Sequence, residues 1–291
     1  MRLRAGRREL ELGGPPLLMG VVNATPDSFS DGGDFTDLDA RAAALVAAGA
    51  DMLDIGGESA IGGRPPVVEE EELERVVPLI ERVVAAHDVL VSVDTYKPAV
   101  AEAAVAAGAS MINDVSGLRD EQLAEVCART GAALVVMHTR VEPKATLLDP
   151  GTYEDVVADV AGFLGERMEA ALATGVGEEQ IVLDPGPDFA KTPAQTVAVL
   201  RRLDALQAFG RPLLLAVSRK DFLGAITGRG PRDRGAATLA ALDAGVRAGA
   251  SILRVHDVAA AADFLAVRAV LEGERKLAPT HGLTPDRFPE R

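Results

Sequence analysis

Short runs of aliphatic and β-branched residues alternate with longer Ala- and Leu-rich segments along most of the chain. The short runs have the length and composition of buried strands, and the longer segments have the apolar spacing of helices. The pattern predicts eight strands, at residues 17–23, 52–55, 90–93, 110–113, 133–137, 181–183, 213–217 and 251–255. It predicts helices at residues 38–48, 70–86, 98–107, 120–130, 153–174, 192–206, 233–248 and 259–272. Such alternation is typical of parallel strands joined by crossover helices.

Several predicted helices end in a glycine that leads directly into the next strand. These glycines are Gly49, Gly108, Gly131 and Gly249. Glycine after the last helical turn favours a left-handed C-cap, because it has no Cβ to clash in that conformation. The spacing of the four positions is irregular, so they indicate a shared structural unit rather than a sequence repeat.

A polar residue stands at or directly after the end of every predicted strand. An open sheet would place its ligand beside only a few strands, whereas a closed barrel directs the C-terminal ends of all its strands at one mouth. The sequence therefore predicts a single-domain (β/α)8 TIM barrel over residues 17–273, with residues 1–16 covering its bottom and residues 274–291 forming a polar tail. The strand-end residues are Asn23, Asp54, Asp94, Asn113, His138, Asp184, Ser218 with Lys220, and Arg254 with His256.

The composition indicates a protein without a nucleic-acid or membrane partner. Of the 291 residues 48% are hydrophobic, and the formal net charge is -14 at pH 7. This charge repels polyanions, so an anionic ligand must be held by a local cluster of cations. The apolar runs are too short for a membrane span or a signal-peptide core, and we expect a cytoplasmic protein. The single cysteine, Cys127, lies in a helical pattern and is expected to be buried.

Two carboxylates and an amide, those of Asp94, Asn113 and Asp184, follow three of the predicted strands. A carboxylate accepts hydrogen bonds from adjacent N–H groups and an amide both donates and accepts, which together match the nitrogens of a polar heterocycle. Each of the three could instead be a helix N-cap, and Asp114 is a better cap than its neighbour Asn113. Because all three are expected at one mouth, we interpret them as ligand-binding residues.

Basic residues follow the last two predicted strands, as Ser218-Arg219-Lys220 and Arg254-Val-His256. Barrel enzymes frequently bind phosphate at this position, and cations there can stabilise a departing phosphate. Arg254 and His256 are two residues apart on a strand and therefore share a face. A purely structural role remains the alternative for His256, and the role of His138 stays open. No spacing of His, Asp and Glu indicates a dedicated metal cage, so we expect any Mg²⁺ to arrive with the phosphates and its waters.

Two glycine-rich segments follow the first two strands. They read Asn23-Ala-Thr-Pro-Asp-Ser-Phe-Ser-Asp-Gly-Gly33 and Asp54-Ile-Gly-Gly-Glu-Ser-Ala-Ile-Gly-Gly-Arg-Pro-Pro66. Their turn-forming residues predict mobile loops over the mouth, and Arg64 is placed to reach a ligand. A plain surface turn is the alternative for each.

Taken in order, these motifs resemble the dihydropteroate synthase family of pterin-binding enzymes over about residues 17–271. The family resemblance implies that para-aminobenzoate is joined to 6-hydroxymethyl-7,8-dihydropterin pyrophosphate, giving 7,8-dihydropteroate and pyrophosphate for folate biosynthesis. It also implies Mg²⁺ as cofactor and a homodimer. The motifs that carry the resemblance are the first glycine-rich segment, Asp54-Ile-Gly-Gly-Glu-Ser, Val93-Asp-Thr-Tyr-Lys, Ile112-Asn-Asp-Val, Val136-Met-His, Asp184-Pro-Gly, Phe189-Ala-Lys-Thr, Ser218-Arg-Lys and Arg254-Val-His-Asp.

The resemblance also implies roles for individual residues. It places the pterin on Asp94, Asn113, Asp184, Lys220 and Arg254, with Lys220, Asp94 and Arg254 acting on the developing charge. It places the pyrophosphate on Asn23, Arg254 and His256, with Asn23 holding Mg²⁺. It assigns the lid loops and the amine site to Thr25, Asp31, Ser59, Arg64 and Asp221.

The chain departs from the usual family pattern where the amine would bind. Ala60 replaces a hydroxyl residue, Arg64 is displaced along its loop, and Asp221 adds a carboxylate where the aminobenzoate carboxylate is usually received. Like charges repel in a partly dry site, so these departures motivate an alternative beside the leading hypothesis of dihydropteroate synthesis. That alternative is a pterin-binding paralogue with another amine substrate or without synthase activity. A pterin-dependent methyltransferase subunit is a third hypothesis, although methyl transfer needs no pyrophosphate pocket.

Overall fold

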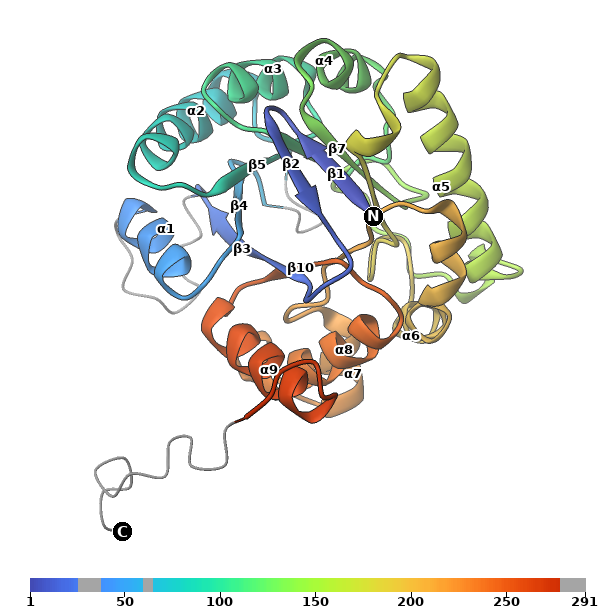
Figure 1. Ribbon diagram of the computed structural model, residues 1–291. Coiled ribbons are helices and arrows are strands. Elements are labelled where there is room, and N and C mark those ends of the chain that lie inside the picture. The colour runs from blue at the N-terminus through green and yellow to red at the C-terminus, as the bar shows by residue number, and fades with distance from the viewer. Residues whose placement is uncertain (26–37, 60–64, 278–291) are drawn as a thin grey trace.

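The computed structural model describes residues 1–25, 38–59 and 65–277 and contains an eight-stranded parallel sheet in the order β8-β7-β6-β5-β4-β3-β10-β9. An isolated parallel bridge between Leu183 and Leu213 joins the two edges of the sheet. The sheet therefore closes on itself, and the predicted barrel is confirmed (Figure 1). The strands are β3 Leu17–Asn23, β4 Met52–Gly56, β5 Leu90–Asp94, β6 Met111–Asp114, β7 Ala133–Met137, β8 Ile181–Asp184, β9 Leu214–Leu215 and β10 Ile252–Val255.

Helices surround the barrel and pack on its outer face (Figure 1). All four glycines that follow predicted helices have positive φ, between 79° at Gly131 and 115° at Gly108, as the C-cap pattern predicts. None of the described helices combines the length and apolar character that crossing a membrane requires. The described α-helices are α1 Leu38–Ala47, α2 Glu69–Ala86, α3 Pro98–Ala106, α4 Gln122–Thr130, α5 Val156–Ala173, α6 Pro193–Arg201, α7 Asp221–Thr227, α8 Gly235–Arg247 and α9 Val258–Leu271.

Strand alternation sorts side chains between the helices and the barrel interior. Along β5, Val91 and Val93 belong to the core shared with the helices, whereas Leu90 belongs to the interior cluster. Residues two apart share a face, so Ser92 and Asp94 point inward with Leu90. The same rule places a polar strand-end residue above an apolar one in β4, β6 and β10. The barrel is therefore apolar at its bottom and polar at its mouth, in the pairs Met52 and Asp54, Met111 and Asn113, and Ile252 and Arg254.

An antiparallel hairpin of β1 Arg2–Ala5 and β2 Arg8–Glu11 lies across one end of the ring of strands (Figure 1). Its residues Leu3, Ala5 and Leu12 belong to the interior cluster. The Gly6 amide donates a hydrogen bond of 2.9 Å to the carbonyl of Gly131, two residues before the start of β7. The hairpin thus covers the end of the barrel opposite the polar mouth.

Several predicted elements differ from those in the structure. The strand predicted at 213–217 is shortened to Leu214–Leu215, with Leu213 in the isolated bridge, because the following residues turn and the Lys220 amide donates to the Val217 carbonyl. The helix predicted at 192–206 is two elements, α6 and a 3-10 helix at Leu203–Phe209. The tighter 3-10 turn aligns residues three apart and buries both Leu203 and Leu206. Three further 3-10 helices lie at Pro150–Thr152, Glu178–Gln180 and Pro231–Asp233 in the described chain.

Candidate active site

Arg254 stands at the mouth of the barrel between two carboxylates. Its Nε donates to Asp54 Oδ2 at 2.6 Å and its Nη2 donates to Asp94 Oδ2 at 2.7 Å. Burial raises the pKa of Asp94 to about 7, although the guanidinium of Arg254 opposes the shift. The pairing fixes the plane of the guanidinium at the centre of the mouth.

Asp54 also sets the orientation of Asn113. The side-chain amide of Asn113 donates to Asp54 Oδ2 at 2.9 Å, so its carbonyl oxygen remains to accept a hydrogen bond from a ligand. Asp54 is fully buried, and its Oδ1 has no hydrogen-bond partner among the described residues. A buried oxygen without a partner is costly, which suits a site that a ligand or water completes.

Asp184 and Lys220 lie on the β8 and β9 side of the mouth. Asp184 Oδ1 accepts a hydrogen bond of 2.7 Å from the Gly186 amide. The Lys220 ammonium lies 4.1 Å from the centroid of the Phe189 ring, within range of a cation–π contact. Burial lowers the pKa of Lys220, while the charges of Asp188, Asp184 and Asp94 favour its ammonium form.

Positive charge gathers around His256. Burial, followed by the charges of Arg254, Arg219, Arg41 and Lys220, lowers the pKa of His256 to about 3. The imidazole is therefore neutral at pH 7, and its Nδ1 lies 2.9 Å from Ser218 Oγ. Arg41 Nη2 donates to the His256 carbonyl at 2.7 Å. In a chain with a net charge of -14, this concentration of cations marks a local anion-binding region.

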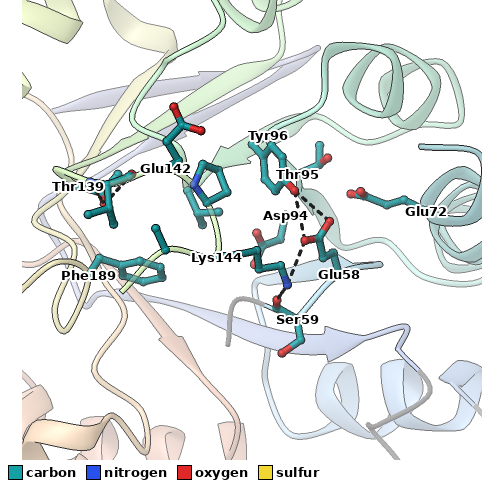
Figure 2. Close-up of a pocket in the computed structure, with 14 residues that line it drawn as sticks. Glu58, Ser59, Glu72, Asp94, Thr95, Tyr96, Thr139, Glu142, Lys144 and Phe189 are labelled. Atoms are coloured by element: carbon teal, nitrogen blue, oxygen red, sulfur yellow. Dashed lines mark hydrogen bonds and ion pairs between the residues drawn. The ribbon is translucent and has the colours of Figure 1, made fainter. Parts of the chain in front are cut away.

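A pocket opens beside Asp94 between the segments that follow β4, β5 and β7. Figure 2 shows Lys144 reaching across it to Glu58 and to the Ser59 carbonyl, with Phe189 on the other side. Lys144 Nζ lies 2.9 Å and Lys97 Nζ 2.6 Å from the Glu58 carboxylate. Burial favours the neutral carboxyl, but these two ammonium groups hold the pKa of Glu58 below its usual value.

The structure brings together most, but not all, of the predicted site residues. Hydrogen bonds join Asp94, Asn113 and Arg254 through Asp54. Mutual charge interactions place Asp184, Lys220 and His256 near them. Asn23 ends β3, Thr25 follows it and is buried, and Ser59 lines the pocket. Asp31, Ala60 and Arg64 lie outside the described residues.

Asp221 does not face the pocket as the sequence suggested. Its side chain is 87% exposed at the start of α7, and its Oδ1 lies 2.8 Å from Arg234 Nη1. The charge of an exposed carboxylate that is paired with a guanidinium is screened by solvent and by its partner, so it repels a ligand anion only weakly. The electrostatic reason for doubting the amine site at this residue is therefore removed.

Sequence reasoning missed several residues that build the site. Asp54 was recognised only as a strand-end residue, and Arg41, Glu58 and Lys97 were given no role. Asp54 had a usable signal, since it is a carboxylate near the C-terminal end of a predicted strand, as Asp94 is. The others depend on which loops meet in three dimensions, which the pattern along the chain does not report.

Two residues left open by the sequence have clear surroundings. Asp114 is fully buried and accepts hydrogen bonds from the amides of Ser116, at 2.7 Å, and Leu118. It holds the turn after β6 and is not the expected helix N-cap, since α4 begins at Gln122 with Glu121 at its N-cap position. His138 is buried between Asp159 and Lys191. Cys127 is fully buried, as expected.

The described residues offer no cluster of three or more His, Cys, Asp or Glu side chains that could hold a metal ion. Asn23 supplies a single amide oxygen at the mouth. Mg²⁺ usually keeps several waters and binds one or two protein oxygens together with substrate phosphates. Asn23 ends β3, the strand that pairs with β10 of Arg254, so one amide oxygen at this strand end fits this mode of binding.

Comparison with known proteins places the chain in a family. A model of pterin binding enzymes matches residues 19–256. The dihydropteroate synthase of Bacillus subtilis is 43% identical over 246 residues, which cover 83% of this chain and 84% of that protein. The chain belongs to the dihydropteroate synthase family. Membership removes the methyltransferase subunit as a hypothesis.

Solved structures of the dihydropteroate synthase family superpose on the barrel. The Xanthomonas albilineans enzyme with 4-aminobenzoic acid is 44% identical, with a TM-score of 0.86 over 94% of this chain and 99% of that chain. The same enzyme in complex with 7,8-dihydropteroate is 43% identical, with a TM-score of 0.83 over 94% and 99% of the two chains.

Proposed function

We propose that this protein is a transferase that condenses para-aminobenzoate with 6-hydroxymethyl-7,8-dihydropterin pyrophosphate to give 7,8-dihydropteroate and pyrophosphate. The observation that carries the proposal is the Arg254–Asp54–Asn113 network, because it joins a pterin-binding constellation to the cations around His256 in one mouth. Family membership supports it, as does the pairing of Asp221 with Arg234.

The pterin is proposed to lie among Asp94, Asn113, Asp184, Lys220 and Arg254. The carboxylates of Asp94 and Asp184 accept from its N–H groups, and the free oxygen of Asn113 does the same. Lys220 donates to the ring carbonyl, and the guanidinium stacks on the ring face. The half-buried to fully buried state of these groups excludes water and strengthens each contact.

The reaction breaks the bond between the exocyclic methylene carbon and the pyrophosphate oxygen, and that oxygen keeps the electron pair. Arg254 and the neutral His256 would stabilise the departing pyrophosphate, and Asp94 would stabilise positive charge on the pterin. The aminobenzoate nitrogen then forms a bond to the methylene carbon and loses a proton to solvent. Cations beside the leaving group and carboxylates beside the ring oppose recombination of the two charges.

We further propose that Asn23 holds Mg²⁺ together with pyrophosphate oxygens and waters. When bound, Mg²⁺ would neutralise charge on the leaving pyrophosphate. Thr25, Asp31, Ser59 and Arg64 are proposed to complete the amine site. A homodimer in the cytoplasm is proposed from the family resemblance, and a single buried thiol suits a reducing compartment.

The proposal is tested by mixing purified protein with the pterin pyrophosphate, Mg²⁺ and para-aminobenzoate, and measuring pyrophosphate release and dihydropteroate. Turnover that requires both substrates is the expected result. Calorimetry with the pterin pyrophosphate alone separates binding from chemistry. Folded protein that binds pterin without aminobenzoate-dependent turnover would instead support the paralogue alternative.

Replacing the two proposed charge-stabilising cations should impair the reaction strongly. Lys220→Ala and Arg254→Ala are each expected to lower kcat/KM by about 10²-fold, as single electrostatic groups in enzymes typically do. Lys276→Ala, at an exposed position, is the matched control and should leave kcat/KM unchanged. Rates within twofold of wild type in both site variants would contradict the assignment.

A further inference from the structure

Lys191 is a lysine in the interior of the molecule, 1% exposed. Its Nζ lies 2.7 Å from His138 Nδ1, 2.9 Å from the Gly186 carbonyl and 3.1 Å from the Phe189 carbonyl. A third carbonyl, that of His138, lies farther away at 3.4 Å. Three close acceptors match the three N–H groups of an ammonium, whereas a neutral amine has only two donors. This geometry fits the ammonium form with all its donors used. Burial lowers the pKa of Lys191 to about 7, while the charge of Asp184 favours the ammonium.

Asp159 determines which nitrogen of His138 can accept a hydrogen bond from Lys191. His138 Nε2 lies 2.9 Å from Asp159 Oδ1, and a carboxylate can only accept, so Nε2 carries the proton and Nδ1 is free to accept from Lys191. Burial lowers the pKa of His138 to about 3, which keeps the ring neutral. The ring packs edge-on against Phe163 at 5.0 Å, and Arg140 holds Asp159. Lys191 is thus tied to a rigid neighbour.

The segment that Lys191 holds, residues 185–190, has an unusual backbone. Gly186, Asp188 and Ala190 have φ values of 62°, 64° and 51°, in the left-handed region. Non-glycine residues persist there only where surrounding contacts hold them. A Cβ at Gly186 would lie 2.1 Å from the His138 carbonyl oxygen, so the backbones approach too closely for any side chain. Lys191 bridges this close approach.

This held segment carries one wall of the candidate active site. Asp184 directly precedes it, and Phe189 within it lines the pocket (Figure 2). The Lys220 ammonium lies 4.1 Å from the centroid of the Phe189 ring. Asp188 Oδ2 accepts from the Phe222 amide at 3.1 Å, which ties the segment to the start of α7 beside Lys220. Lys191 itself is not among the pocket-lining residues.

We propose that Lys191 is a positioning residue for the reaction, which fixes the Phe189 ring and through it Lys220 by clamping the Gly186 and Phe189 carbonyls to His138. The inference rests on the proposed function. Without the ammonium, two buried carbonyls and a ring nitrogen lose their donor, and the left-handed segment relaxes towards ordinary backbone. Phe189 then leaves the pocket wall, and Lys220 leaves the geometry in which it is proposed to meet the pterin.

The test compares Lys191→Met, which keeps the length of the side chain but removes the donors, with Gln180→Met. Gln180 is equally buried, and its Nε2 also donates to two carbonyls, those of Cys127 at 2.9 Å and Ala132 at 2.7 Å. It lies at the opposite end of the barrel, beside Arg4 of the hairpin, and serves as the matched control. Thermal unfolding, kcat, both KM values and pterin binding by calorimetry are measured for wild type and both variants.

We expect both variants to lose thermal stability, but only Lys191→Met to lose at least tenfold in kcat/KM, chiefly in kcat. Comparable kcat/KM in the two variants at equal folded fractions would assign Lys191 to folding alone and overturn the proposal. Absence of turnover in wild type would instead refute the proposed function. If Lys191→Met does not fold, His138→Phe removes one acceptor and should lower kcat/KM at least threefold, and an unchanged value there would also overturn the proposal.

Discussion

Asp54 shows how one carboxylate can organise a site without being an expected ligand residue. A single oxygen of Asp54 accepts from both Arg254 and Asn113, and the other oxygen has no partner among the described residues. The residue thereby couples the proposed stacking cation to the proposed pterin acceptor. A change in its charge should disturb both at once.

The substitution Asp54→Asn tests this coupling. The shape is kept and the amide oxygen can still accept from Arg254 and Asn113, but the negative charge that pairs with the guanidinium is lost and an NH₂ group takes the place of the partnerless Oδ1. We expect kcat/KM to fall by about tenfold or more, because one member of a buried charged network loses its partner. The control is Asp88→Asn, because Asp88 is an exposed carboxylate paired with Arg8, and this variant should have the kcat/KM of the wild type. Equal rates in the two variants would show that Asp54 does not organise Arg254.

For Asp221, in contrast to Asp54, we expect a substitution to have almost no effect on the kinetics. Because its carboxylate is 87% exposed and paired with Arg234, Asp221→Ser should change the KM for para-aminobenzoate by less than about twofold. The measurement is a titration of para-aminobenzoate at saturating pterin pyrophosphate. A fall in KM of about fivefold or more would restore the repulsion argument, since it would mean that the charge reaches the amine site.

At the scale of elements, the sequence was most informative where the pattern was long. All eight barrel strands lie within the predicted segments to about one residue, although β9 is much shorter than predicted, and the four glycines after helices have the expected positive φ. The hairpin of β1 and β2 was missed because two four-residue strands give too little alternation to recognise. The helix α7 was missed for the same reason, as it has seven residues and an internal glycine.

In the candidate site, too, some features were predictable from the sequence and others were not. The polar ends of strands were visible in the sequence because parallel strands bring their ends to one mouth, whatever the details of register. The partners were not visible, because the pairing of Arg254 with Asp54 and Asp94 depends on barrel closure. Lys191 belongs to the Phe189-Ala-Lys-Thr motif, but the sequence assigned it no role. Nothing in the local pattern distinguishes a buried lysine from an exposed one.

Two glycines within helices, Gly162 and Gly245, differ in the space available for a side chain. Gly162 lies in α5, where no other atom of the described chain, apart from the helix backbone and its sequence neighbours, is within 4 Å of an added Cβ. In α8 an added Cβ at Gly245 would lie 2.0 Å from Leu215 Cδ2, in the buried core.

We therefore expect opposite effects of the same substitution. Gly162→Ala should stabilise the protein by about 0.5–1 kcal/mol, because alanine restricts the unfolded chain and favours the helix. Gly245→Ala should destabilise it by about 1–3 kcal/mol, because the overpacked core must move Leu215. Denaturant unfolding of both variants measures the two values. The same sign in both would mean that helix propensity alone governs these positions.

At the scale of the whole molecule, the stability of the barrel should depend on pH through histidines that are buried in their neutral form. His138 is fully buried, and burial lowers its pKa from 6.5 to about 3. Between these two pH values the unfolded chain binds a proton at this residue and the folded chain does not. Stability contributed by neutral His138 is therefore complete above about pH 6.5 and is lost progressively as the pH falls.

The size of this effect follows from proton linkage. One proton bound only by the unfolded state changes the free energy of unfolding by about 1.4 kcal/mol per pH unit. His138→Phe removes this proton uptake while the carboxylates that titrate in the same range remain. Between about pH 4.5 and 6, the free energy of unfolding of the variant should therefore fall less steeply with acid, by up to this amount per pH unit. Parallel pH dependences for wild type and variant, measured by denaturant unfolding, would mean that His138 is protonated in the folded protein. Its Nδ1 could then no longer accept the hydrogen bond from Lys191, and the clamp on the 185–190 segment would have to be held by the carbonyls alone.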